Sequence, residues 1–387
     1  MNSPVIEMLA PRYQLAWQPW AVQYFFLVAL SYCSFWIAVP GLLLGRASWA
    51  ATARFALLAA MTTAIVAPIA LLADLHQPLR FWHFYAHFTP TSWMSVGSLL
   101  LPPYVFAVIA LAWLAWRAPM LAWRARGDWR GTVARIATLG GWRTPRALVL
   151  AVGGLALLLS LGITIYTGSE IAIIKARSLW YTPWLIPIFI TTGMIGAAGL
   201  VLVLNRMAGP RDDRTAWQML ALIVAGGVFT GGIIVAWVLE GLFQRNSSVA
   251  AAIDSVRWDP QWRAAAFWGV SVGAFLTAGA ALALRRAGLR ARAWVLGLVG
   301  LHLAWMARWT ILMEVQTVQK QTAGMTQYVV GWNSNGWVGV IGTFGLWIAI
   351  VMIVDILVPW RAALRGADTA PPARTGPAGK EGALSHG

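Results

Sequence analysis

Long apolar runs alternate with short polar stretches along the chain, and nine of these runs are long enough to cross a bilayer. A helix needs about 20 apolar residues to span the hydrocarbon core. Pro68 lies inside the second run and predicts a kink or an early end of that helix. The pattern predicts an all-α polytopic membrane protein whose spans cover residues 20–44, 55–72, 93–116, 146–166, 183–204, 217–239, 264–284, 293–313 and 337–358.

The composition excludes an ordinary water-soluble enzyme. Of the 387 residues, 59% are hydrophobic and only 11% are charged, whereas a soluble domain carries about 25% charged residues. The single cysteine, Cys33, excludes a disulfide framework, a cysteine-ligated iron–sulfur cluster and a cysteine zinc site within this chain. A membrane haem needs paired histidines deep in facing helices, and only His302 lies deep in a predicted span. We therefore expect no haem, iron–sulfur cluster or other metal in this chain.

The basic charge predicts the orientation of the chain in the membrane. The chain has 29 Lys and Arg residues against 13 Asp and Glu residues, a net charge of +16. Twenty of the basic residues lie in the odd-numbered loops and the C-terminal segment, and eight lie in the N-terminal segment and the even-numbered loops. Because cytoplasmic loops are enriched in Lys and Arg, we expect a periplasmic N-terminus and a cytoplasmic C-terminus in a bacterial inner membrane. The charge then indicates topology and contact with anionic lipid, not binding to nucleic acid.

Polar residues gather at the predicted outer ends of four spans. Arg308 lies about five residues inside the eighth span, and an ionisable residue at such a depth is a candidate for function. Its guanidinium could reach the interface beside Trp305 or Trp309, or it could pair with an outer carboxylate, namely that of Asp74, Glu170 or Glu314. The polar candidates at these span ends are Gln23, Tyr24, Asp74, His76, Arg80, Trp82, Tyr166, Glu170 and Glu314.

These residue types suit the head group of a quinol. Oxidation of a quinol releases two protons, so it needs acceptors such as His, Asp or Glu within hydrogen-bond reach of the hydroxyls. His76 and Asp74 are the natural proton acceptors, and Arg308 could keep a neighbouring carboxylate ionised. Gln23, Tyr24 and Tyr166 could orient the ring. The vestibule of a secondary transporter could contain similar residues, so this alternative stays open.

Several segments resemble a known family. The first runs Ala73-Asp74-Leu-His76-Gln-Pro-Leu-Arg80-Phe-Trp82-His83, and the second runs Tyr166-Thr-Gly168-Ser-Glu170. Both are similar to landmark motifs of the NrfD/polysulfide-reductase membrane-subunit family. Further segments, at residues 17–26, 308–318 and 342–347, resemble the branch of that family that anchors tetrathionate reductases. The resemblance covers about residues 1–358.

The resemblance implies a function and a set of partners. Family members oxidise a quinol, here menaquinol or ubiquinol, near the outer face of the membrane. They pass the electrons to a ferredoxin-like iron–sulfur subunit docked outside, which serves a molybdopterin catalytic subunit. Sister anchors serve enzymes that act on sulfite, thiosulfate or polysulfide, and a passive anchor without quinone chemistry is a further alternative. The resemblance places the quinone site at the outer end of the first four spans, which agrees with the polar candidates found there. We expect catalytic roles for Asp74, His76, Glu170 and Arg308 and expect the remaining candidates to bind the quinone.

The resemblance also implies two four-helix bundles followed by one C-terminal helix. On this basis we expect an outer N-terminal segment at residues 1–19 and a first bundle with the quinone site at residues 20–166. A second bundle would follow at residues 167–313, and an outer loop with the ninth span at residues 314–358. Residues 359–387 are rich in Pro, Gly, Ala and charge, which predicts a disordered cytoplasmic tail.

Overall fold

The computed structural model describes residues 15–209, 211–244, 247–318 and 329–361. The expected disordered tail lies almost wholly outside these residues. Nine helices of membrane-spanning length and composition occur within the described ranges, which confirms the predicted fold class. Their bounds are α1 Pro19–Leu42, α2 Ala50–Asp74, α4 Trp93–Trp123, α6 Arg146–Ala172, α7 Leu185–Met207, α8 Asp213–Gln244, α10 Pro260–Arg285, α12 Ala293–Trp309 and α14 Trp337–Leu357.

Short helices connect the spans, and the sequence pattern did not predict them. Beyond α12, a π-helical turn (η3, Thr310–Glu314) and α13 (Val315–Thr317) prolong the eighth span. Pro68 lies inside α2 but does not end it. The helix continues for six further residues, to Asp74. The remaining connectors are η1 Ala47–Trp49, η2 Pro78–Arg80, α3 His83–Ala86, α5 Trp129–Ala137, α9 Ser247–Trp258 and α11 Ala287–Arg290.

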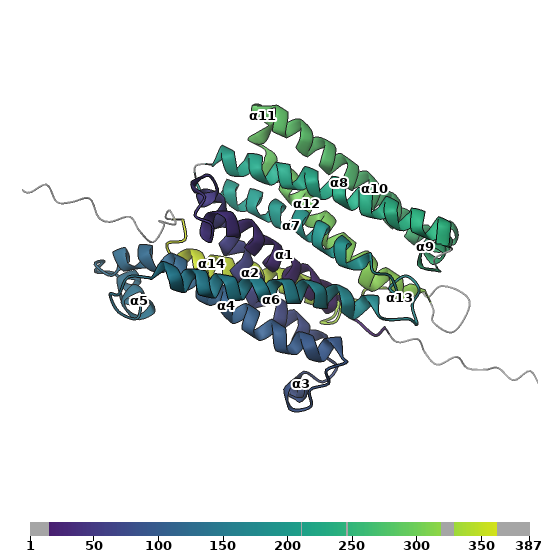
Figure 1. Ribbon diagram of the computed structural model, residues 1–387, viewed down its shortest axis with the longest axis horizontal. Coiled ribbons are helices and arrows are strands. Elements are labelled where there is room, and N and C mark those ends of the chain that lie inside the picture. Colours follow the sequence, from purple (N-terminus) through teal and green to yellow (C-terminus); the bar gives the residue numbers. More distant parts are fainter. Residues whose placement is uncertain (1–14, 210, 245–246, 319–328, 362–387) are drawn as a thin grey trace, which may run out of the picture.

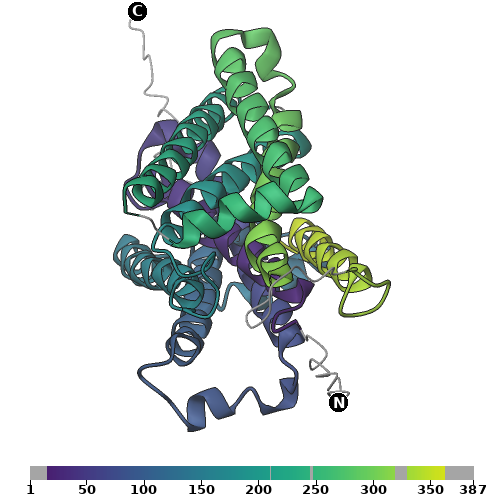
Figure 2. The same cartoon turned by 90° about the vertical axis from the view of Figure 1, so that its right-hand side faces the viewer.

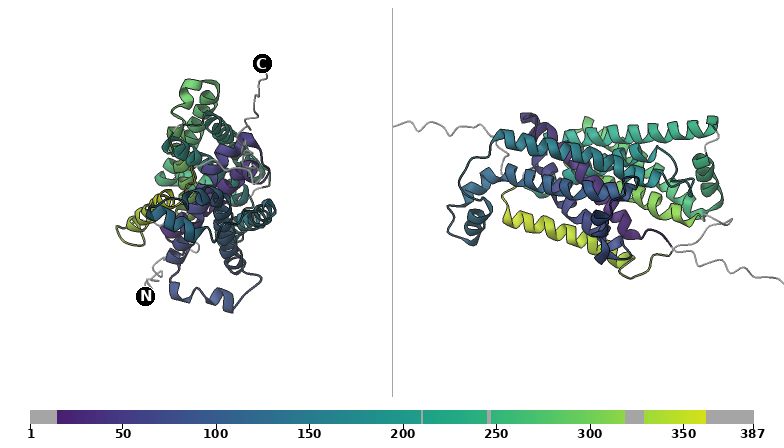
Figure 3. Two further views of the ribbon diagram at one scale, coloured as in Figure 1. Left: turned by 90° about the vertical axis from the view of Figure 1, so that its left-hand side faces the viewer. Right: turned by 60° about the horizontal axis from the view of Figure 1, so that its bottom comes forward.

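The spanning helices form two rings of four. In the first ring α1 contacts α2, α2 contacts α4, α4 contacts α6, and α6 returns to α1. In the second ring the same sequence of contacts runs through α7, α8, α10 and α12 (Figure 1). The rings meet where α1 and α7 pack against each other, and α14 lies outside the rings against α1 and α2 (Figure 3).

Burial differs sharply between the spans. About 78% of the most apolar window of α1 is buried inside the protein, but only 17% of that of α10. The apolar surface of α10 therefore faces lipid, whereas α1 is surrounded by protein. Helix α1 carries the buried polar side chains of Gln23, Tyr24 and Ser31, and polar groups inside a protein core need partners on the neighbouring helices.

The two ends of the helix bundle differ in chemistry. We call the end that carries Asp74, Glu170 and Glu314 the site end, and the end that carries Arg117 and Arg290 the basic end. In Figure 1, α3 and α9 lie at the site end, and α5 and α11 lie at the basic end.

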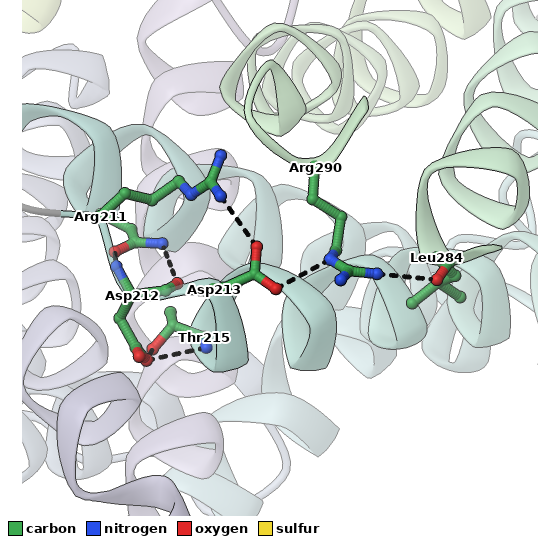
Figure 4. Close-up of polar contacts among 7 residues, drawn as sticks. Arg211, Asp212, Asp213, Thr215, Leu284 and Arg290 are labelled. Atoms are coloured by element: carbon green, nitrogen blue, oxygen red, sulfur yellow. Dashed lines mark hydrogen bonds and ion pairs between the residues drawn. The ribbon is translucent and has the colours of Figure 1, made fainter. Parts of the chain in front are cut away.

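A polar network at the basic end joins the start of α8 to its neighbours. Figure 4 shows Asp213 between two guanidinium groups, Arg290 at 3.0 Å and Arg211 at 2.9 Å. Asp212 accepts a hydrogen bond of 2.9 Å from the backbone N–H of Thr215. The Thr215 hydroxyl lies 2.9 Å from that of Thr52 on α2, so this network connects the second ring to the first.

We expect Gly199→Ala to destabilise the contact between α7 and α12. A Cβ atom at Gly199 would lie 2.5 Å from the backbone oxygen of Gly297, so the two helices would have to separate. Overpacking of this kind costs about 1–3 kcal/mol, which a denaturant titration of the purified protein in detergent would measure. The matched control is Gly154→Ala, where the new methyl group meets open space. Equal stability of the two variants would contradict the close approach.

Candidate functional site

Four polar side chains from three helices of the first ring come together at the site end. Tyr166 and Glu170 share one face of α6, which continues through Gly168 to Ala172. The Tyr166 side chain interacts with both Glu170 and Tyr24 of α1. Glu170 also interacts electrostatically with Asp74, the last residue of α2. We call Tyr24, Asp74, Tyr166 and Glu170 the polar cluster.

Among the described residues, two buried atoms of the polar cluster have no partner at normal hydrogen-bond geometry. They are Oη of Tyr24, whose side chain is fully buried, and Oε2 of Glu170, a residue that is 8% exposed. Buried polar atoms of folded proteins are nearly always hydrogen-bonded, and each exception calls for an explanation. A hydroxyl and a carboxylate oxygen left unpaired in one cluster are the groups with which a polar ligand could bond.

Asp74 connects the buried part of the polar cluster to the surface. Its Oδ1 accepts a hydrogen bond of 3.0 Å from the backbone N–H of Gln18, which immediately precedes α1. The first amides of a helix lack partners within the helix, and the helix dipole favours negative charge at that point. On its other side Asp74 interacts with His76, which is exposed. Asp74 therefore lies between the exposed His76 and the buried Glu170.

An apolar pocket of about 280 Å³ opens beside the polar cluster, between α2, α4 and the loop that joins them. Tyr166 is the member of the polar cluster that lines it. Leu72, Met94 and Phe106 line the pocket and are exposed along the sides of α2 and α4, where lipid would lie. The other lining residues are Pro68, Leu71, Leu75, Phe81, Phe84, Tyr85, Ser98, Leu101, Pro102 and Val105.

Gly97 of α4 makes room for the Tyr166 ring. A Cβ atom at this position would overlap the ring carbons Cζ and Cε2, so the backbone of α4 lies directly against the ring. The sequence analysis did not single out Gly97, which is one of 37 glycines. It also missed Phe81, Phe84 and Tyr85 as parts of a pocket. The signal that could have found them is the aromatic run directly after the Asp74 motif.

Arg308 departs from both sequence expectations. It is fully buried, so it does not reach the interface, and within the described residues it forms no ion pair. Its guanidinium instead donates to Thr192 Oγ1 at 2.6 Å, to Phe189 O at 2.7 Å and to Ala304 O at 3.1 Å. The neutral oxygens of α7 thus take the place of the expected carboxylate. Arg308 also interacts with Tyr32, which interacts with Thr167 directly beside Tyr166.

Four other predicted site residues lie away from the polar cluster. Gln23 donates to Val340 O and accepts from the Trp305 indole, so it connects α1 to α14 and α12. The Glu314 carboxylate accepts hydrogen bonds from Gln261 and Trp309 in the second ring. Arg80 and Trp82 are exposed on the loop beyond the pocket and are not among its lining residues.

Two residues that the sequence analysis missed connect the site-end segments. Gln316 accepts hydrogen bonds from the backbone N–H groups of Ala16 and Trp17 and donates to Trp17 O, so it holds the segment before α1. Arg177, after α6, donates to Val315 O and Val318 O. Burial lowers the pKa of the Arg177 guanidinium to about 10, so it stays charged at neutral pH.

Fold and site together define a polytopic α-helical membrane protein with a partly unpaired polar cluster at one end of its first ring. The family model for the membrane protein described as polysulphide reductase, NrfD, matches residues 7–320. The chain belongs to this family. Within the described residues, no group of three or more His, Cys, Asp or Glu side chains could hold a metal ion.

Two relatives belong to reductases. The chain is 33% identical over 360 residues to a tetrathionate reductase subunit of Salmonella typhimurium, and the matched region covers 90% of this chain and 94% of the relative. It is 23% identical over 222 residues to a selenate reductase subunit of Mesobacillus selenatarsenatis, which covers 53% of this chain and 51% of that protein. The first similarity extends over nearly the whole of both proteins.

We expect Arg308→Lys to destabilise the protein although the charge is retained. The two terminal nitrogens of the Arg308 guanidinium donate separately to Thr192 and to Phe189, and the single ammonium of a lysine cannot reproduce this geometry. Each hydrogen bond to a charged group contributes about 1.5–3 kcal/mol. Denaturant titration of the purified protein should show a loss of about 2–4 kcal/mol. Arg257→Lys, at an exposed arginine, should be neutral. An unchanged denaturant midpoint for Arg308→Lys would show that the paired hydrogen bonds of the Arg308 guanidinium do not stabilise the structure.

Proposed function

We propose that this chain is the membrane anchor and quinol-oxidising subunit of a multi-subunit oxidoreductase of sulfur compounds, with tetrathionate reductase as the first candidate. The observation that carries the proposal is the apolar pocket that ends at Tyr166, beside the unpaired Tyr24 Oη and Glu170 Oε2. The 33% identity to a tetrathionate reductase subunit over 90% of this chain favours that enzyme over those that act on sulfite, thiosulfate or polysulfide.

The pocket suits a menaquinone or ubiquinone head group. Ligand pockets commonly measure about 300–1,000 Å³ and combine apolar walls with a few convergent polar groups. A volume of about 280 Å³ accommodates the ring but not a long isoprenoid tail. The tail would leave between Leu72 and Phe106, whose exposed side chains flank the pocket. Tyr166 would hold a ring oxygen, and Glu170, which interacts with Tyr166 behind the pocket wall, would receive the proton through the Tyr166 hydroxyl.

The side chains of the polar cluster supply a route for protons. A bound quinol provides two electrons and two protons. Each of the two protons in turn would pass from a quinol hydroxyl through the Tyr166 hydroxyl to Glu170, since a general base must lie within hydrogen-bond reach of the proton that it removes or of the group that relays it. Asp74, which interacts with Glu170, would receive the proton, and the exposed His76 would release it to water. Arg308 would act on this site through Tyr32 and Thr167.

The loop between α2 and α4 would contact the partner that receives the electrons. Figure 2 shows this loop reaching away from the helices at the site end. It carries exposed apolar side chains, which are Leu79, Phe81, Trp82, Tyr85 and Phe88. We assign the docking of a ferredoxin-like iron–sulfur subunit to this end, with a molybdopterin catalytic subunit beyond it. With the N-terminus in the periplasm, this end faces outward in a bacterial inner membrane.

Two observations argue against the alternative functions. A secondary transporter binds its substrate near the middle of the membrane, at helices that are broken in both halves. The pocket described here lies at one end of the first ring, and the corresponding carboxylate of the second ring, Glu314, is bonded to Gln261 and Trp309. A passive anchor would give no reason for the two unpaired atoms of the polar cluster.

We expect the double variant Asp74→Asn with His76→Gln to abolish quinol-driven turnover of the complex. Loss of positioned proton acceptors costs about 10²–10⁴ in rate. Reduction of the terminal substrate by an artificial dye should stay at the wild-type level, because a dye donates electrons directly to the partner subunits. His302→Gln, at a histidine bonded to Trp268 on the second ring, serves as the control. Wild-type quinol activity in the double variant would refute the assigned proton route.

We expect Gly97→Ala to weaken quinol binding by about tenfold or more. The added methyl group displaces the Tyr166 ring from its position against α4, and one lost hydrogen bond with its packing is worth about 1.4 kcal/mol or more. The measurements are the KM for a quinol and the inhibition constant of a quinone analogue, compared with those of Gly154→Ala. Unchanged values for Gly97→Ala would place the head group elsewhere.

A further inference from the structure

The connection between α4 and α6 at the basic end folds into a compact unit, which we call the α5 hairpin (residues 124–145). Its helix α5 begins after Asp128, whose carboxylate accepts a hydrogen bond of 3.0 Å from the backbone N–H of Gly131. After α5 the chain reverses through Leu139 and Gly140, which both have positive φ angles. The hairpin lies at the left end of Figure 1, remote from the polar cluster.

The α5 hairpin folds back along α4 instead of extending beyond it. The Trp113 indole donates to Ala137 O at 2.8 Å. Arg117, which is fully buried, donates to Thr138 O at 3.0 Å and to Gly140 O at 2.9 Å. The end of α5 and the following turn therefore lie level with residues 113–117 of α4, although α4 continues to residue 123.

This level corresponds to the edge of the bilayer. About 20 helical residues cross the hydrocarbon core, and α4 reaches that length at about Trp113 when counted from Trp93. The residues that meet Trp113 and Arg117 therefore lie at the depth of the lipid head groups. Side chains of the hairpin that point toward the bilayer at this depth would contact lipid.

Helix α5 has an apolar face that no part of the described chain covers. Its small residues Gly131 and Ala134 are buried. Trp129, Val133 and Ile136 follow at the spacing i, i+4, i+7 and form one stripe. Ile136 is 70% exposed and Trp129 is 52% exposed. Leu139, in the turn after α5, continues the stripe and is 70% exposed.

Basic residues surround this stripe. Arg126, Arg135 and Arg143 are exposed, and Arg124 and Arg130 are partly exposed. Asp128 is the only acidic residue of the hairpin, and it pairs with Arg126 at 2.9 Å. A helix with a large apolar stripe and flanking arginines is typical of segments that lie in the membrane interface and attract anionic lipids.

We propose that the α5 hairpin is an interfacial anchor that inserts the stripe of Trp129, Ile136 and Leu139 between lipids and binds the head groups of anionic phospholipids through its arginines. Depth, apolar exposure and positive charge all point to a lipid surface. The anchor holds the far end of α4, the helix whose other end lines the pocket at Met94 and Ser98. It therefore sets the depth at which that pocket opens to the bilayer. This inference does not depend on quinone binding.

The first test measures the depth of the stripe. The full chain with Cys33→Ser and Ile136→Cys carries a nitroxide label and is reconstituted into nanodiscs of phosphatidylcholine and phosphatidylglycerol. We expect oxygen, which partitions into lipid, to relax the nitroxide at position 136 strongly, and a water-soluble nickel chelate to relax it weakly. Gly127→Cys, before α5 and with open space around its Cβ, should show the reverse. A label at position 136 that meets the nickel chelate as freely as one at position 127 would overturn the proposal, and would indicate a surface for a soluble protein instead.

The second test measures the preference for anionic lipid. Spin-labelled phosphatidylglycerol is titrated against the reconstituted wild type, the double variant Arg126→Gln with Arg130→Gln, and the control Arg257→Gln with Arg263→Gln at the site end. Each arginine near an anionic surface contributes about fivefold in affinity, so the hairpin variant should lose about tenfold or more of its preference for phosphatidylglycerol over phosphatidylcholine. The control should keep it. An unchanged preference in the hairpin variant would refute the role of the arginines.

Discussion

The buried charge of Arg308 is the constraint that fixes α12 against α7, the helix of the second ring that packs against α1 of the first. Removing a guanidinium from water costs several kcal/mol, which only well-placed partners can offset. Here the partners are Thr192 and Phe189 of α7, so α12 and α7 can slide past each other only by losing those bonds. A Cβ at Gly193 of α7 would lie 3.2 Å from both Arg308 and Cys33 of α1. The charge therefore fixes the register of α12 and α7, where a purely apolar contact would tolerate sliding. The interaction of Arg308 with Tyr32 of α1 extends this constraint to the first ring.

The position of the polar cluster follows from that junction and from the bonds at the site end. Tyr24 belongs to α1, the central helix, and the Asp74 carboxylate bonds directly to the amide before that helix. Gln316, beyond α12, holds the same segment from the second ring. The cluster is thus held from both rings although its members come from the first. Firm support on all sides explains how Tyr24 Oη and Glu170 Oε2 can stay buried without partners, because an unsupported site would rearrange to satisfy them.

The sequence predicts where the membrane spans lie, but it predicts less well which face of each helix packs against which neighbour. Apolar length alone predicts the nine spans, and the i, i+4 spacing predicts that Tyr166 and Glu170 share a face once α6 continues through Gly168. By contrast, α1 is apolar on nearly all sides, so no periodicity shows that Gln23 points to α12 and α14 while Tyr24 points to α6. The partners of Arg308 were equally invisible, because two of them are backbone oxygens, which carry no sequence signal, and the third is the single hydroxyl of Thr192. Helix α5 escaped notice because it has only nine residues and lies in a connection between spans, where the search for long apolar runs does not register it.

The exposed basic residues that give the chain its net charge and the buried charge of Arg308 act on different parts of the molecule and its surroundings. The screening length in physiological salt is about 8 Å, and a membrane-spanning helix is about 30 Å long. The exposed arginines of the basic end therefore exert almost no field at the polar cluster, and their effect is confined to lipid and topology. Arg308 is different because it is fully buried and interacts with Tyr32, which in turn interacts with Thr167, the residue after Tyr166. Our proposal that Arg308 acts on the polar cluster rests on this burial, because low dielectric preserves a charge that water and salt would screen.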